Sequence, residues 1–131
     1  MRCCCNILGQ DPLLPGNVYS WRILYSGYPL NIFVGVINES NFKSDEWCED
    51  LAHGCFNGFG DPSGCLSGKS SQWDEHEILE ISVDMTKNVM TIRSVGNDGI
   101  SLTGVLPMLS QGYYYPFFVL YRNDHVIELV D

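Results

Sequence analysis

The chain is poor in basic residues. Its 131 residues include 7 Lys and Arg against 16 Asp and Glu, which gives a formal net charge of −9. Proteins that bind nucleic acids cluster Lys and Arg to neutralise phosphates, so this balance argues against a nucleic-acid partner. Residues 45–84 hold most of the acids and a single base, Lys69. They form either a solvated acidic surface or one that attracts a basic partner. The third alternative, a calcium site, lacks the usual Asp-x-Asp-x-Asp-Gly spacing.

Long apolar runs are also absent. No window approaches the about 18 uninterrupted apolar residues of a membrane span, and the N-terminus lacks the apolar core of a secretory signal. We therefore expect a cytoplasmic protein without a membrane partner. The chain has six cysteines, but Cys3, Cys4 and Cys5 are adjacent and poorly placed to pair with one another. In a reducing compartment we expect free thiols and folding without disulfides.

Motifs for catalysis and cofactor binding are missing as well. There is no Gly-x-Ser-x-Gly elbow, and Gly68-Lys69-Ser70 lacks the earlier glycine of a phosphate loop, since Ser63 stands there. Cys48, Cys55 and Cys65 are too widely spaced for the knuckle of a zinc site. The three histidines fit ordinary surface positions. We expect no catalytic residue, no metal and no cofactor, and therefore no enzyme.

The sequence does contain patterns typical of β-strands. Alternation over 17–25 and over 78–85 places apolar side chains on one face and polar ones on the other. Residues 31–37 are apolar on both faces, as in a central strand that is covered on both sides. No 3.6-residue apolar period persists long enough for a helix. Short strands separated by turns predict an all-β fold, a twisted antiparallel β-sandwich with roughly eight to ten strands.

The C-terminal residues predict a β-hairpin. An aromatic run over 114–121 and an alternating run over 126–130 are joined by four polar residues. We expect residues 1–16 to form an irregular N-terminal arm and residues 17–131 to form the domain. The predicted core is Trp21, Ile23, Phe33, Val34, Val36, Leu79, Ile81, Val83, Phe117, Val119, Ile127 and Leu129.

Several of these segments, in this order, resemble a SPRY domain. Tyr115–Tyr121 is similar to the family's Tyr-Pro-Phe-Val-Ser-Leu-Tyr strand, and 81–84 to its Gly-Val-x-Leu-Asp strand. Phe33–Val36 is similar to a core Ile-Gly-Val strand. Trp47 with 53–61 is similar to the Gly-Trp and Tyr-Gly-Tyr-x-Gly-Asp segment, with one extra residue. The resemblance covers about residues 17–130. It implies a β-sandwich that binds peptides or proteins and does not catalyse reactions.

The resemblance also implies where a partner binds. In SPRY relatives the partner lies across loops at one end of the sandwich. The matching positions are Trp47, Phe56, Phe59, Arg122 and Asn123. We expect a protein or peptide partner, favoured when it is basic, and a monomer. Most relatives carry the module beside a catalytic or assembly domain, such as a ubiquitin-ligase element, so a role as a substrate-recruiting adaptor is one implication.

A carbohydrate-binding sandwich of the galectin type is the alternative function. Trp73 is followed by Asp74 and Glu75, an arrangement similar to a sugar-stacking tryptophan beside carboxylates. The His-x-Asn-x-Arg strand of such lectins is absent, because no histidine here has an asparagine two residues later. The sequence therefore favours the protein-interaction module.

Overall fold

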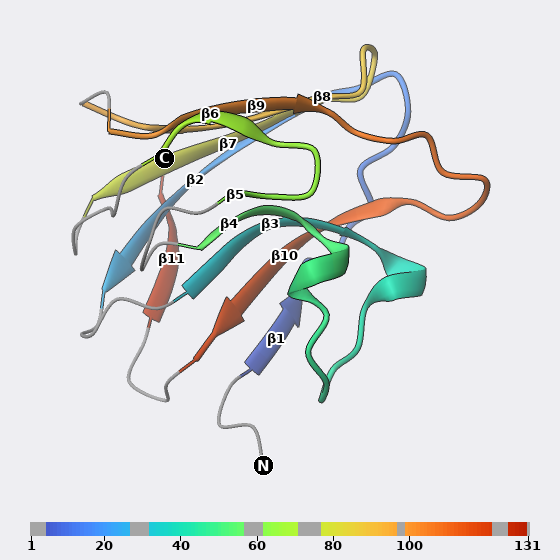
Figure 1. The fold of residues 1–131 in the computed structure, drawn as a ribbon, viewed down its shortest axis with the longest axis horizontal. Helices are drawn as coiled ribbons and strands as arrows, with labels where there is room; N and C mark the ends of the chain where they lie inside the picture. The colour runs from blue at the N-terminus through green and yellow to red at the C-terminus, as the bar shows by residue number, and fades with distance from the viewer. Residues whose placement is uncertain are drawn as a thin grey trace.

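Two antiparallel sheets pack face to face in the computed structural model (Figure 1). It describes residues 5–26, 32–56, 62–70, 77–96, 99–121 and 126–130. The five-stranded sheet has the order β1 (Cys5–Leu8), β10 (Tyr114–Leu120), β3 (Ile32–Asn38), β4 (His53–Phe56) and β5 (Pro62–Ser63). The six-stranded sheet has the order β11 (Val126–Val130), β2 (Val18–Ser26), β7 (Ile78–Asp84), β8 (Val89–Ser94), β9 (Ser101–Val105) and β6 (Ser67–Lys69). The predicted all-β sandwich is confirmed.

The helical segments of the described ranges are two 3-10 turns, η1 (Glu39–Asn41) and η2 (Glu49–Leu51). Both lie in the long connection between β3 and β4, over the outer face of the five-stranded sheet (Figure 1). No helix in the described part of the chain is long and apolar enough to cross a membrane.

The main core lies between the sheets. Alternation on β7 buries Leu79, Ile81 and Val83 completely and leaves the residues between them partly exposed. On β3, Ile32, Val34 and Val36 point to the same core. Gly35 lets β4 approach β3, because a Cβ there would lie 2.1 Å from the His53 carbonyl oxygen. The predicted core residues Val34, Val36, Leu79, Ile81 and Val83 are therefore confirmed, whereas Phe33 is buried outside this core.

A second apolar cluster lies on the outer face of the five-stranded sheet. Phe33 and Ile37 of β3 and Phe117 and Val119 of β10 are fully buried there, together with Cys48 and Ala52 of the covering connection. The prediction that β3 is covered on both faces is thus confirmed. Phe117 and Val119 are buried as predicted, but they lie in this outer cluster, whereas their neighbours Phe118 and Leu120 pack against the main core.

Three sequence predictions about the strands and the core are wrong. The C-terminal hairpin does not form: β10 is flanked by β1 and β3, so its two edges are occupied, and β11 pairs with β2 in the other sheet. Residues 5–8 of the expected irregular arm form strand β1, and Leu13 of the same segment is buried. Leu129, predicted in the core, is 73% exposed, while Ile127 and Trp21 are partly buried against the core. A domain boundary at residue 17 stays a prediction.

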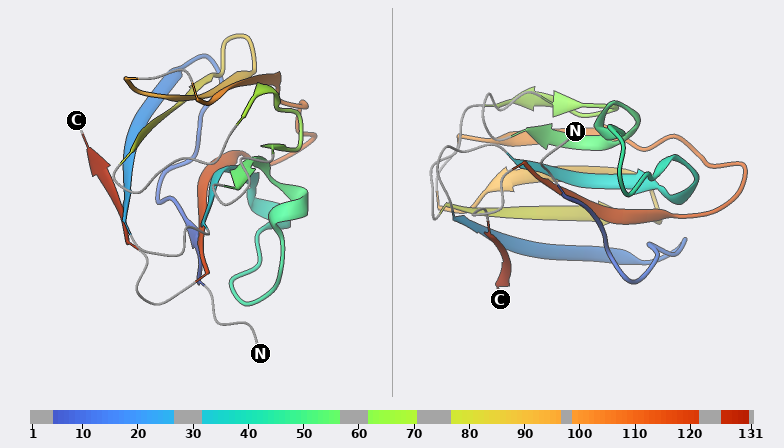
Figure 2. Two further views of the ribbon diagram at one scale, coloured as in Figure 1. Left: turned by 60° about the vertical axis from the view of Figure 1, so that its left-hand side comes forward. Right: turned by 90° about the horizontal axis from the view of Figure 1, so that it is seen from below.

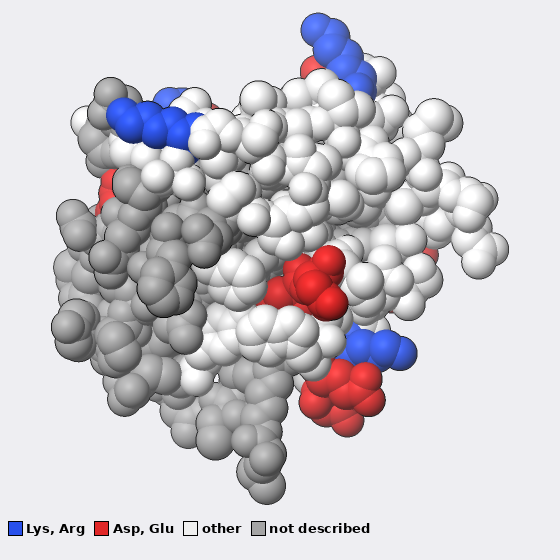
Figure 3. Space-filling view, viewed as in Figure 1, with Lys and Arg blue, Asp and Glu red and all other residues white. Residues whose placement is uncertain are grey.

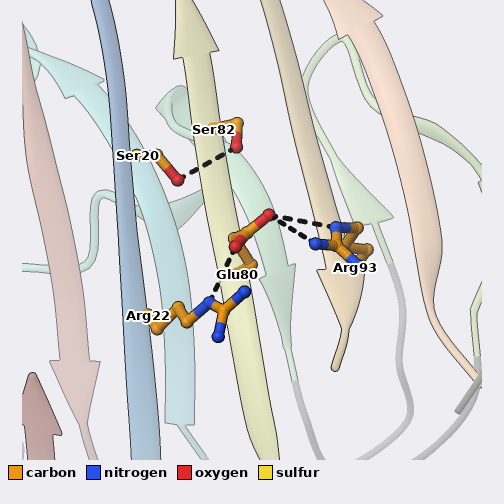
Figure 4. Close-up of polar contacts among 5 residues, drawn as sticks. All are labelled: Ser20, Arg22, Glu80, Ser82 and Arg93. Carbon is orange, nitrogen blue, oxygen red and sulfur yellow. Dashed lines mark hydrogen bonds and ion pairs between the residues drawn. The ribbon is translucent and has the colours of Figure 1, made fainter. Parts of the chain in front are cut away.

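The outer face of the six-stranded sheet is polar. Arg22 of β2, Glu80 of β7 and Arg93 of β8 lie side by side in one cross-strand row (Figure 4). Nε of Arg22 donates to one oxygen of Glu80 at 2.8 Å, and Nη2 of Arg93 approaches the other at 2.8 Å. These two Arg partners lower the pKa of Glu80. The Arg22 and Arg93 side chains on this face are 39% and 51% exposed to water.

Candidate binding surface

Three aromatic rings meet at one edge of the covered face. Trp47 precedes η2 and Phe56 ends β4, and their rings stack with centroids 6.4 Å apart and an interplanar angle of 18°. Tyr121 directly follows β10, and its ring centroid lies 6.0 Å from that of Trp47 and 6.3 Å from that of Phe56. We call Trp47, Phe56 and Tyr121 the aromatic cluster. The structure therefore brings together two residues, Trp47 and Phe56, that the sequence places in a binding site.

The aromatic cluster is exposed on one side and anchored on the other. The Trp47 side chain is 56% exposed, whereas Phe56 and Tyr121 are half-buried. Beneath them Phe56 packs edge-on against the buried ring of Phe33, with centroids 4.9 Å apart. Exposed aromatic side chains that rest on a rigid base lose little conformational entropy when a partner covers them.

Sequence reasoning missed Tyr121 and Glu49. The Glu49 side chain is fully buried in η2, where its Oε1 accepts a hydrogen bond from the Cys48 backbone N–H at 3.1 Å. Its Oε2 accepts a hydrogen bond from the Tyr121 hydroxyl. Burial of a carboxylate is costly unless such bonds replace water. Glu49 thus joins η2 to the end of β10, and the only sequence signal for it was an acid beside Trp47 and Cys48.

The loop that carries Trp47 is also held by contacts with β1 and β10. The Asn6 side-chain amide on β1 donates to the backbone carbonyls of Lys43 at 2.6 Å and Glu46 at 2.7 Å. The next ring inward, Phe42, packs edge-on against Phe117 with centroids 6.0 Å apart. The two ends of the loop are therefore tied to the five-stranded sheet, and Trp47 is presented from a fixed position.

Exposed acidic residues flank Trp47 in the sequence. Asp45, Glu46 and Asp50 are exposed on the same connection, and Lys43 is the base among them. Figure 3 shows acidic groups gathered over η2 and the loop before it. Such a surface favours approach of a positively charged partner, more strongly at low ionic strength.

The remaining predicted site residues fall outside the described residues. These are Phe59, Arg122 and Asn123, and the same holds for Trp73, Asp74 and Glu75 of the lectin alternative. In sequence, Phe59 follows β4 by three residues and Arg122 follows Tyr121 directly. Their part in the site stays a prediction.

His53, expected as an ordinary surface histidine, is instead half-buried. Its Nδ1 accepts a hydrogen bond from the Cys65 backbone N–H at 2.9 Å, and its ring packs edge-on against Tyr114. Burial lowers the pKa of His53, which favours the neutral ring that this bond needs. His53 therefore joins the turn after β5 to strand β4 through this hydrogen bond.

The thiols near His53 are not activated for nucleophilic chemistry. Burial raises the pKa of Cys55 to about 12 and also raises the pKa of Cys65, which disfavours the reactive thiolate. Both cysteines are free of disulfides. Within the six described ranges, no three His, Cys, Asp or Glu side chains are grouped as a metal site requires.

Comparison with known proteins identifies the fold. No protein-family model and no curated protein sequence matches the chain. Among solved structures, the SPRY domain of human HERC1 superposes with a TM-score of 0.72 at 12% identity, over 98% of this chain and 83% of that one. Stonustoxin superposes with a TM-score of 0.64 at 13% identity, over 95% of this chain, which spans 22% of the stonustoxin chain. The fold of this chain is therefore that of a SPRY β-sandwich.

Proposed function

We propose that this chain is a non-enzymatic protein-interaction module that binds a peptide or protein partner through the aromatic cluster. The observation that carries the proposal is the exposed Trp47 indole, stacked on Phe56 and Tyr121 over a fully buried base. Aromatic side chains held in this way are the commonest anchors of protein interfaces, because they bury large area at low entropic cost.

The partner segment carries positive charge. Asp45, Glu46 and Asp50 flank the aromatic cluster, so Lys or Arg side chains on the partner would gain favourable electrostatic energy on approach. Phe59, Arg122 and Asn123 complete the surface by their place in the sequence next to Phe56 and Tyr121. We further propose that the protein acts as a cytoplasmic monomer and serves as an adaptor that recruits its partner to other proteins.

Photo-crosslinking beside the aromatic cluster captures the partner covalently, so that mass spectrometry can identify it. A benzophenone amino acid at Leu51, which is 50% exposed in η2, is expected to capture a partner specifically. The same probe at Met108, which is 88% exposed in the connection from β9 to β10, serves as the matched control. Capture must disappear in the Trp47→Ala background.

Two results would contradict the proposal. One is equal capture from both positions. The other is unchanged affinity of the identified partner for folded Trp47→Ala, Phe56→Ala and Arg122→Ala variants. A glycan array run in parallel addresses the lectin alternative: specific sugar binding that survives loss of Trp47 would favour a carbohydrate ligand.

A further inference from the structure

A second apolar recess lies away from the aromatic cluster, at the open side of the sandwich. It has a volume of about 420 Å³ and lies between the inner faces of the two sheets. Phe118 of β10 lines one wall, Trp21 of β2 and Leu129 of β11 line the other, and residues 9–13 close one end. A recess of about 300–1,000 Å³ with mostly apolar walls is the usual size of a ligand pocket.

Leu129 shows that this side of the core is incompletely covered. It lies opposite Ile23 on β2, so its side chain belongs to the inner face, where Ile23 is buried. Yet Leu129 is 73% exposed. The reason is its place on β11, the outermost strand of the six-stranded sheet (Figure 2, left). A further strand beside β11 would cover Leu129 and close the recess.

The backbone of β11 offers such a strand a partner. β11 pairs with β2 along one edge, and the other edge carries no strand in the described part of the chain. Unpaired N–H and C=O groups on an edge strand are a template for an added strand. Of the features that protect an edge, the residues of β11, Val-Ile-Glu-Leu-Val, include neither Pro nor Lys, and Glu128 is the single charge.

The side chains around this edge define the chemistry of the added strand. Side chains that point inward would enter the apolar recess over Trp21, Phe118 and Leu129. Glu128 points to the outer face, where the residue directly opposite it on β2 is the apolar Leu24. Arg22, the nearest base on β2, lies opposite Val130 and is paired with Glu80. A Lys or Arg on an added strand beside Glu128 would form a cross-strand pair of opposite charges.

We propose that β11 binds an extended segment of a partner protein as an added strand, with apolar side chains in the recess and basic side chains outward. This site is separate from the aromatic cluster, because none of Trp47, Phe56 and Tyr121 lines the recess. The proposal therefore does not depend on the function proposed above.

Two synthetic peptides of equal apolar content test the proposal. They are the acetylated and amidated pentapeptides Lys-Ile-Lys-Ile-Lys and Glu-Ile-Glu-Ile-Glu. The basic peptide is expected to slow amide hydrogen exchange in residues 126–130 and to bind at least tenfold more tightly than the acidic one. The Leu129→Asp variant should lose at least tenfold in affinity for the basic peptide. Because Leu129 is exposed, this variant is expected to fold, which its thermal melt checks.

A matched control separates this site from the aromatic cluster. Leu51→Asp, which places the same charge on an exposed leucine of η2, should leave the protection of residues 126–130 by the basic peptide unchanged. The proposal is overturned if the basic peptide fails to protect β11, if both peptides bind equally, or if folded Leu129→Asp binds as the parent does. Protection of β11 that rises with protein concentration alone would also overturn it, because a second copy would then occupy the edge.

Discussion

The outer faces of the two sheets meet their surroundings in opposite ways. The six-stranded sheet presents a polar outer face, with Arg22, Glu80 and Arg93 paired across three strands. The five-stranded sheet presents an apolar outer face, where Phe33, Ile37 and Phe117 are buried beneath the connection from β3 to β4. To keep this face buried, the connection from β3 to β4 must itself be held against the sheet. The aromatic cluster forms where this cover ends, so the candidate binding surface is a consequence of the covered face.

A substitution in the covered outer face of the five-stranded sheet is expected to change the free energy of unfolding most. Phe117→Ala removes a fully buried ring that contacts both Phe33 and Phe42. We expect it to lower the free energy of unfolding by about 3–5 kcal/mol. Thr91→Ala on the outer face of the six-stranded sheet should change it by less than about 0.5 kcal/mol. Urea denaturation measures both. Similar losses for the two variants would mean that the outer faces do not differ as described.

Removal of the buried carboxylate is expected to have the next largest effect. Glu49→Ala leaves the Cys48 N–H and the Tyr121 hydroxyl without the acceptor they use. The expected loss is about 1–3 kcal/mol in the free energy of unfolding, with a change in the fluorescence of the adjacent Trp47. Asp50→Ala, an exposed acid one residue later, is the control and should leave both nearly unchanged. A Glu49→Ala protein as stable as the parent would refute the role of Glu49 as the anchor of η2.

His53 makes the stability of this sheet depend on pH. Its pKa is lowered from 6.5 in the folded protein, so between the lowered value and 6.5 the unfolded chain binds more protons. The stability that neutral His53 contributes is therefore fully present above pH 6.5 and is lost as the pH falls below that value. We expect the urea midpoint to drop less from about pH 7.5 to about pH 5.5 in His53→Gln than in the parent. Equal drops in the two proteins would contradict this assignment.

A substitution on the polar outer face of the six-stranded sheet is expected to change the free energy of unfolding least. Glu80→Gln removes the charge that pairs with Arg22 and Arg93, but water screens this row. We expect a loss of at most about 1 kcal/mol at neutral pH that shrinks as salt is added. Because the pKa of Glu80 is lowered, its contribution is present above the unfolded pKa and is lost as the pH falls through the folded value. A loss as large as that of Phe117→Ala would contradict this account of the polar face.

The same contrast explains what the sequence could predict. Strand β7 has water on one side, so its alternation reveals both the strand and its inner face. Strands β3 and β10 are covered on both sides, so their apolar runs reveal burial but not which face each side chain takes. This is why Phe117 was correctly predicted as buried, while its place beneath the covering connection was not foreseen.

The errors arise where pairing between distant segments decides the outcome. A short connection between β10 and β11 suggests a hairpin, but β1 and β3 occupy the edges of β10, and the free edge of β2 takes β11. β1 has only four residues and no periodicity of its own, so its strand depends on pairing with β10. Tyr121 and Glu49 meet across 72 positions in sequence, and no local pattern signals such a contact.

The candidate site was predictable in part for a related reason. Trp47 and Phe56 were found through resemblance to a family in which aromatic residues occur at these positions. The fold then places them 6.4 Å apart on separate elements, which alternation and composition alone do not predict. The anchoring groups, Glu49 and Asn6, act through hydrogen bonds to loop backbone and a distant hydroxyl, and so leave no periodic signal.

We propose that the aromatic cluster, at the end of the covered face, is the recognition surface. The most direct test is the affinity of the crosslinked partner for Trp47→Ala and for Met108→Ala, measured by calorimetry on proteins with matched thermal melts. Trp47→Ala should weaken binding at least tenfold, as expected for an anchor residue at an interface, whereas Met108→Ala, at an exposed site on another connection, should bind as the parent does. Equal affinity of the Trp47→Ala variant and the parent would contradict the claim.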